Sequence, residues 1–169
     1  MSLYLIANGP APTVASQVAV TTGTAIKTLI QVKPGATQVM RIVEWGISFD
    51  GSSAATPGTI ELCVTDVAAT VTAHVASGLH KIDSAALAQG DPTTNLFSVG
   101  TTSTGYTASG EGTVGAVRML DVQQISGTNQ YVKQLPLGRE YIVNPAEFMR
   151  IRVKFATAVN AICFVMCEV

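Results

Sequence analysis

The clearest pattern in the chain is an alternation of apolar and polar residues with a period of two, which is typical of a β-strand with one buried face. Its best example is residues 148–155. Met149, Ile151, Val153 and Phe155 share one side there, and Arg150, Arg152 and Lys154 share the other. We therefore expect a strand that lays its apolar face on a core and turns a basic stripe to solvent.

Other segments with strand-like patterns indicate an antiparallel, β-rich fold. They are residues 24–32, 39–49, 59–65, 113–125, 131–135 and 160–168. In 39–49, Trp45 is expected on one face with Val43, Ile47 and Phe49. The turn-forming residues 126–129 suggest that 113–125 and 131–135 pair with each other.

The segment 160–168 is apolar on both faces. Ile162, Phe164 and Met166 lie on one side, and Cys163, Val165 and Cys167 lie on the other. This pattern predicts a central strand, or a strand that a neighbouring subunit covers. All three cysteines of the chain, Cys63 included, are expected as buried thiols, because they do not form a disulfide framework.

Three segments lack a strand pattern. Residues 84–112 are rich in Gly, Ser and Thr and predict a long polar loop. Residues 8–17, within an N-terminal stretch of about 20 residues, predict an extended arm, and residues 67–80 fit either a short helix or a strand. Together the patterns predict one all-β domain over residues 1–169, a jelly-roll-like β-sandwich.

The composition adds one observation to this picture, which is that the chain has few charged residues. Only 12% of the residues are charged, against about 25% in an ordinary soluble domain, and the mean hydropathy is +0.37. The net charge of −1 makes nucleic acid an unfavourable partner. Because no apolar run reaches the roughly 20 residues of a membrane span and the N-terminus lacks a signal-peptide pattern, we expect a protein made in a cytoplasm whose surface other chains cover.

Residues that could carry chemistry do not form a recognisable site. The string at 110–115 matches GxGxxG, but a β-like run follows it where a nucleotide-binding helix is required. His74 and His80 are too far apart along a strand to share a metal ion, and the carboxylates are scattered. We therefore expect no catalytic residues, no metal and no cofactor.

The residues expected at an interface come from the strand patterns alone. They are Trp45, Arg150, Arg152, Lys154, Ile162, Phe164 and Met166. Trp45, the single tryptophan, is expected as a core or interface anchor. The alternative use for it is a sugar-stacking platform, which requires an exposed ring.

Several stretches resemble small all-β virion proteins of tailed bacteriophages, most of all capsid decoration (cement) or auxiliary proteins. The resemblance lies in the opening Met-Ser-Leu-Tyr-Leu-Ile-Ala, in the Thr/Ala/Gly-rich body, and in residues 43–51 and 131–140. It implies a β-sandwich without catalysis. It also implies a homo-oligomer, as a trimer, whose arms and loops grip the major capsid protein.

The sequence thus leads to a non-enzymatic virion protein that binds and stabilises a capsid lattice. Low charge, apolar faces and flexible segments suit a protein that adds many weak contacts through repeated docking. Two alternatives stay open: another virion component, such as a tail or head fibre, and a carbohydrate-binding jelly-roll module.

Overall fold

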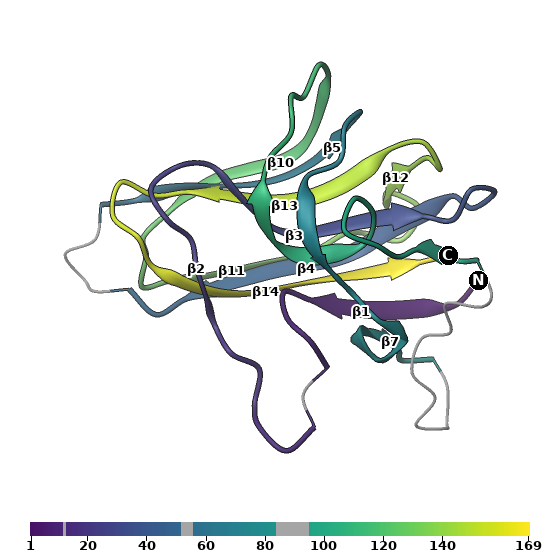
Figure 1. Ribbon diagram of the computed structural model, residues 1–169, viewed down its shortest axis with the longest axis horizontal. Helices are drawn as coiled ribbons and strands as arrows, with labels where there is room; N and C mark the ends of the chain where they lie inside the picture. The colour runs from purple at the N-terminus through teal and green to yellow at the C-terminus, as the bar shows by residue number, and fades with distance from the viewer. Residues whose placement is uncertain (12, 52–55, 84–94) are drawn as a thin grey trace.

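The protein is a sandwich of two antiparallel β-sheets, as Figure 1 shows. The computed structural model describes residues 1–11, 13–51, 56–83 and 95–169. Among these residues the only helical turn is the 3₁₀ turn Ala76–Gly78, and none of them belongs to a helix long and apolar enough to cross a membrane. The expected all-β sandwich is confirmed.

The first sheet, sheet A, contains the two ends of the chain. Its strands are β1 (Leu3–Ala7), β2 (Val20–Thr21), β4 (Met40–Phe49), β7 (Leu79–Lys81), β11 (Gln130–Gln134), β12 (Tyr141–Val143) and β14 (Asn160–Glu168). Their order is β11–β4–β14–β1–β7, with β12 also paired to β4 and β2 to β14. The backbones of Ser2 and Val169 exchange hydrogen bonds of 3.0 and 3.1 Å, which places the two termini side by side.

The second sheet, sheet B, holds most of the middle of the chain. Its strands are β3 (Lys27–Pro34), β5 (Gly58–Thr65), β6 (Thr70–Ala73), β9 (Gly105–Gly110), β10 (Val117–Ile125) and β13 (Phe148–Lys154), and the short strand β8 (Phe97–Ser98) pairs with β3. Their order is β10–β5–β13–β3–β9–β6. The segment 67–80 is therefore β6, the 3₁₀ turn and most of β7, so the strand interpretation is the better one.

The core fills the space between the two sheets. Met149, Ile151, Val153 and Phe155 are all buried, as the alternation predicted. They meet buried residues of sheet A such as Ile6, which is fully enclosed. The three cysteines are buried free thiols, as expected, and burial raises the pKa of Cys63 to about 11.

The alternation in β4 reverses partway along the strand, which the sequence pattern did not predict. Met40 and Ile42 are buried at one end, and Trp45 and Ile47 are buried at the other. The pairing with β14 explains the reversal, because Met166 lies opposite Glu44 while the next residue, Cys167, lies opposite Ile42. Val43 is thus the extra residue of a β-bulge, and a bulge shifts the side-chain alternation by one position.

The predicted pairing of 113–125 with 131–135 is wrong. β10 pairs with β5 in sheet B, whereas β11 pairs with β4 in sheet A. The turn between them therefore connects the two sheets across one end of the sandwich. A turn signal fixes where the chain reverses, but the partner of each strand depends on which apolar face finds the core.

The predicted long loop is shorter than expected, and the predicted N-terminal stretch of about 20 residues begins with a paired strand. Residues 84–94 lie outside the described part of the chain, but β8 and β9 lie within the predicted loop. Gly105 explains the misreading, because a Cβ there would be 2.3 Å from the carbonyl oxygen of Thr72. Because glycine has no Cβ, β9 can lie this close to β6. Leu3–Ala7 is the paired strand β1, so an arm can begin only after it, at Asn8, where the sequence predicted its start.

Candidate interaction surface

The outer face of β14 is apolar in the folded chain. Cys163, Val165 and Cys167 face the core, whereas Ile162, Phe164 and Met166 alternate with them on the outer side of sheet A. The strand lies between β4 and β1, so the prediction of a central strand is confirmed. The outer side chains are only partly covered by their own chain.

Neighbouring strands extend this apolar face in both directions. The register places Gly46 and Val132 beside Phe164, and it places Leu5 beside Met166. The residues Leu3, Leu5, Ala7, Val132, Ile142, Ile162, Phe164 and Met166 form what we call the outer face of sheet A. Solvent-facing strand positions are usually polar, so an apolar group of this kind is unusual on an outer face and is typical of surfaces that contact other molecules.

Gly46 lets the Phe164 ring lie flat on this face. A Cβ at Gly46 would be 2.6 Å from the Phe164 ring and 3.0 Å from Val132. The absence of a side chain on β4 therefore makes room for the ring to bridge three strands. Val132, at the edge of the group, is 55% exposed.

Charges on the outer face of sheet A are few, with one arginine and two glutamates. Arg41 on β4 lies directly opposite Glu168 on β14 in the register. Glu44 lies opposite Met166, and His80 lies opposite Leu5. The apolar centre thus carries polar groups mainly around its border, which is the usual arrangement of a protein–protein interface.

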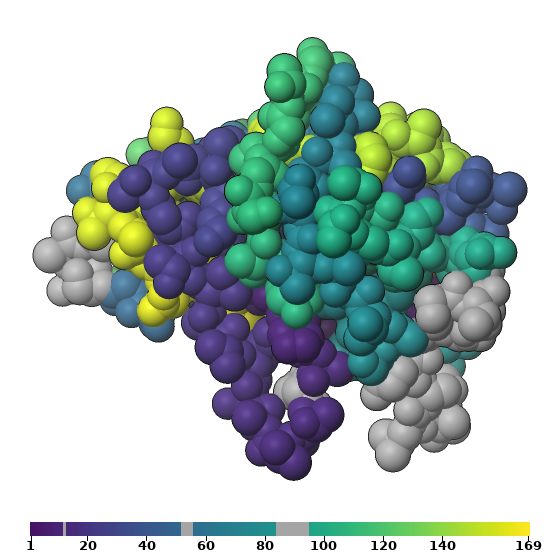
Figure 2. Space-filling model, in the orientation of Figure 1, coloured from purple at the N-terminus to yellow at the C-terminus, as the bar shows by residue number. Residues whose placement is uncertain are grey.

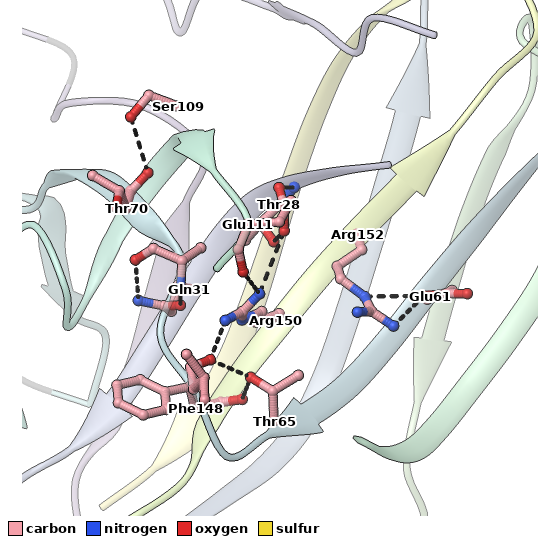
Figure 3. A network of polar contacts seen from close by, with 12 residues as sticks. Thr28, Gln31, Glu61, Thr65, Thr70, Ser109, Glu111, Phe148, Arg150 and Arg152 are labelled. Atoms are coloured by element: carbon pink, nitrogen blue, oxygen red, sulfur yellow. Dashed lines mark hydrogen bonds and ion pairs between the residues drawn. The ribbon is translucent and has the colours of Figure 1, made fainter. Parts of the chain in front are cut away.

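The basic stripe expected on β13 is not a solvated face, which corrects the sequence prediction. Arg150 is fully buried, and its Nη1 donates to the backbone oxygen of Glu111 at 3.0 Å and lies 3.4 Å from the Glu111 carboxylate. Its Nη2 donates to the carbonyl oxygen of Val67. Figure 3 shows the guanidinium of Arg150 beside Glu111 and Thr28. Burial lowers the pKa of Arg150, and the charge of Glu111 opposes that change.

Glu111 is the residue that sequence reasoning missed here. Its two carboxylate oxygens accept hydrogen bonds from the backbone nitrogen and the hydroxyl of Thr28, at 2.6 and 2.5 Å. Thr28 lies next to the point where the register between β3 and β13 shifts, and the carboxylate satisfies its backbone donor there. The only signal was its place in the glycine string 110–115, which leads into β10 and not into a helix.

The other two residues of the stripe differ from Arg150. Arg152 donates to the carboxylate of Glu61 on β5 from both Nε and Nη2, at 3.0 and 2.7 Å (Figure 3). Lys154 is exposed. Of the expected basic contacts, only Lys154 therefore presents its charge freely on the described surface.

Trp45 is fully buried, so it offers no surface to a partner or to a sugar. Its Nε1 donates to Asp121 at 3.3 Å, and the same carboxylate accepts from Tyr131 at 2.9 Å and pairs with Lys133 at 3.2 Å. Asp121 lies on β10, and the other two hydrogen-bonding partners lie on β4 and β11. These four residues join the two sheets at the side where β10 of sheet B lies near β11 of sheet A. We call the cluster of Trp45, Asp121, Tyr131 and Lys133 the Asp121 latch.

Electrostatics in the latch favour the ionised carboxylate. Burial acts to raise the pKa of Asp121, but hydrogen bonds from Gln123, Tyr131 and Lys133 outweigh it and hold that pKa below its ordinary value. Burial and the bond to Asp121 together raise the pKa of Tyr131. A carboxylate with this many donors is a structural link between elements.

His74 is a buried, neutral side chain. Its Nε2 lies 3.0 Å from the carbonyl oxygen of Ala7, while its Nδ1 has no partner among the described residues and faces the Cα of Gly78. Burial lowers the pKa of His74 to about 4. No group of three or more His, Cys, Asp or Glu side chains in the described part of the chain could hold a metal ion.

A hollow lies beneath the segment that follows β1. It has a volume of about 340 Å³ and is lined by residues 8–11, 13–18 and 20 and by Tyr106. Most of its wall belongs to a single irregular segment. Asn8 anchors the start of this segment, because its amide donates to the oxygen of Ala161 and accepts from the nitrogen of Cys163.

The chain was compared with known proteins on three levels. No protein-family description, no curated protein and no solved structure matches it. The surface described above is therefore the basis for a functional proposal.

Proposed function

We propose that this protein is a non-enzymatic structural component of a virion, which binds and stabilises a phage capsid lattice as a decoration protein. The observation that carries the proposal is the outer face of sheet A. It gathers eight apolar side chains on four strands of a chain in which only 12% of the residues are charged.

A broad and nearly uncharged sheet face suits docking on another folded surface. Apolar area removed from water contributes about 25 cal/mol per Å², but association costs reduce what one contact gains. A protein present in many copies on a lattice adds such modest contacts repeatedly, which stabilises the whole shell. The resemblance stated above adds a homotrimer bound to the major capsid protein, made in the host cytoplasm, to this proposal.

The same face would also serve another position in the virion, such as a tail or head fibre. A carbohydrate-binding role has less support, because Trp45, the ring expected to stack on a sugar, is enclosed in the core. Immunogold labelling of particles distinguishes a head position from a tail position.

Cosedimentation with capsids tests the proposal. Capsids of the phage that carries this sequence, prepared without the protein, should bind it and gain heat stability. Phe164→Glu should abolish binding, because it buries a charge in the contact. Val75→Glu is the matched control, since Val75 is 63% exposed and lies outside the outer face of sheet A. Failure of the unaltered protein to sediment with capsids, or equal loss in both variants, would contradict the proposal.

A further inference from the structure

The segment after β1 has backbone groups without partners. Residues 13–18 belong to no strand, and no backbone hydrogen bond between described residues involves them. Val14 is fully exposed and Val18 is 73% exposed. In Figures 1 and 2 this purple segment stands out below the body of the sandwich. Exposed backbone N–H and C=O groups bond to water, and those of this segment can exchange that water for another strand.

This segment is also free of charge. The first charged side chain of the sequence is Lys27, and β-branched valines occupy positions 14 and 18. In an extended strand those two positions lie on the same face. The segment therefore has the properties of a β-strand that lacks a sheet.

One edge of sheet B lacks a neighbouring strand among the described residues. β10 is the last strand of its sheet, and its second edge has no strand beside it among the described residues. Val117, Met119 and Val122 are 43–50% exposed along it. An edge strand presents a row of unpaired N–H and C=O groups, which is a template for another strand.

Natural edge strands are usually protected, and β10 has little protection. Its two charged residues are engaged elsewhere: Arg118 donates to the carbonyl oxygen of Ile142 and pairs with Glu147, and Asp121 is enclosed in the latch. One bulge between Met119 and Asp121 interrupts its nine residues. At the other ends of the two sheets, among the described residues, β7 has three residues and β6 has two register shifts. β11 and β12 share one edge of β4, with Lys133 on β11 and only three residues in β12.

The segment and the edge lie on opposite sides of one molecule. In Figure 1 residues 13–18 hang below the sheets, while β10 and β5 lie in the upper part of the view. We propose that residues 13–18 of one copy add as a strand to the free edge of β10 in a neighbouring copy. Donor and acceptor are different surfaces, so the contact is head-to-tail, and such contacts form closed rings when the rotation permits.

Charge supports a second copy as the occupant. The donor segment has no charged residue, and the two charged side chains of the acceptor edge already have partners, Arg118 with Glu147 and Asp121 with Lys133. Strand addition therefore brings no like charges together and leaves no ion without its partner. Backbone hydrogen bonds would supply the pairing and the exposed valines the side-chain contacts, as in other cases of strand addition.

A cysteine cross-link tests the inference directly. Two differently tagged copies are coexpressed, one with Val14→Cys and the other with Val122→Cys, and then oxidised. The native thiols do not compete, because Cys63, Cys163 and Cys167 are buried. We expect a mixed disulfide between the two tags. Val132→Cys on β11 replaces Val122→Cys in the control, since Val132 has a similar exposure on the other sheet. A mixed disulfide no more abundant than in this control would overturn the inference.

Solution mass gives a second, independent readout. Light scattering should show an oligomer for the unaltered chain and for Val75→Asp, and a shift to the monomer mass for the double variant Val14→Asp and Val18→Asp. Both valines are exposed, so circular dichroism should stay unchanged. A monomeric unaltered chain, or an oligomer that the double variant leaves intact, would contradict strand exchange. Capsid binding is tested separately, by cosedimentation, because it uses the outer face of sheet A. A failure of one proposal can therefore be told apart from a failure of the other.

Discussion

At the scale of single residues, Arg150 holds two connecting segments against sheet B. Its guanidinium contacts Val67, which follows β5, and Glu111, which follows β9. A buried guanidinium without its counter-ion costs about 3–5 kcal/mol. The pair therefore determines whether both connections stay docked on β13.

Replacing Glu111 should be strongly destabilising. We expect Glu111→Ala to lower the free energy of unfolding by about 3–5 kcal/mol, because it strands the buried charge and frees the Thr28 donors. Urea unfolding measures the loss. The control is Glu147→Ala, whose pair with Arg118 is 31–48% exposed and should cost about 1 kcal/mol or less. Equal losses in the two variants would contradict a special role for Arg150.

His74 should make stability depend on pH. Its folded pKa of about 4 lies below the ordinary value of 6.5, so the unfolded chain binds a proton that the folded chain excludes. Stability should fall as the pH drops from about 6.5 to about 4, by about 3 kcal/mol in total. His74→Gln should remove this slope while keeping a donor to Ala7. Urea midpoints at several pH values test it, and an unchanged slope in the variant would exclude His74 as its source.

At the scale of elements, the bulges decide which side chains meet. The bulge in β10 turns Asp121 toward Trp45, and the bulge at Val43 turns Trp45 toward the core. β10 and β11 belong to different sheets, so the Asp121 latch acts where no backbone ladder joins them. Where β10 and β11 meet, the contact between the two sheets therefore depends on the side chains of these two strands.

Breaking the latch should loosen this side of the sandwich. Asp121→Ala leaves Trp45, Tyr131 and Lys133 without their shared acceptor, which should cost about 2–4 kcal/mol. The fluorescence of Trp45, the single tryptophan, should shift to the red as water approaches the ring. Asp50→Ala, which also removes a carboxylate with hydrogen bonds but at an exposed turn, should leave the emission unchanged. A blue emission in Asp121→Ala would show that the latch is dispensable.

At the scale of the whole molecule, most strand pairs join distant parts of the chain. β1 pairs with β14, β13 pairs with β3 and β5, and β14 pairs with β4. Closing such long loops must precede the contacts that stabilise them. The topology therefore favours slow and cooperative folding.

Refolding should take milliseconds to seconds, as for other all-β domains dominated by distant pairings. Stopped-flow fluorescence of Trp45 follows it directly, because the ring is enclosed only once β4, β10 and β11 come together. A refolding phase completed within microseconds would contradict this topology as the folded state in solution.

The sequence was most informative where a strand has regular alternation. The inward residues of β13 and the two apolar faces of β14 followed from spacing alone, because the strand period is fixed at two. The prediction failed for β4 at Val43, where one extra residue reverses the faces. It failed for Arg150, because alternation shows the side on which a residue lies but not what covers that side.

The sequence by itself determined the all-β class, the core strands and the scarcity of charge, since these depend on composition and on local periodicity. Only the tertiary structure decided that β10 and β11 part into different sheets, that Glu111 meets Arg150, and that the apolar side of β14 stays open. Those results depend on contacts between residues far apart in the chain, where register and bulges set the partner. No local pattern encodes such a choice, because it is made by the packing of the two sheets as a whole.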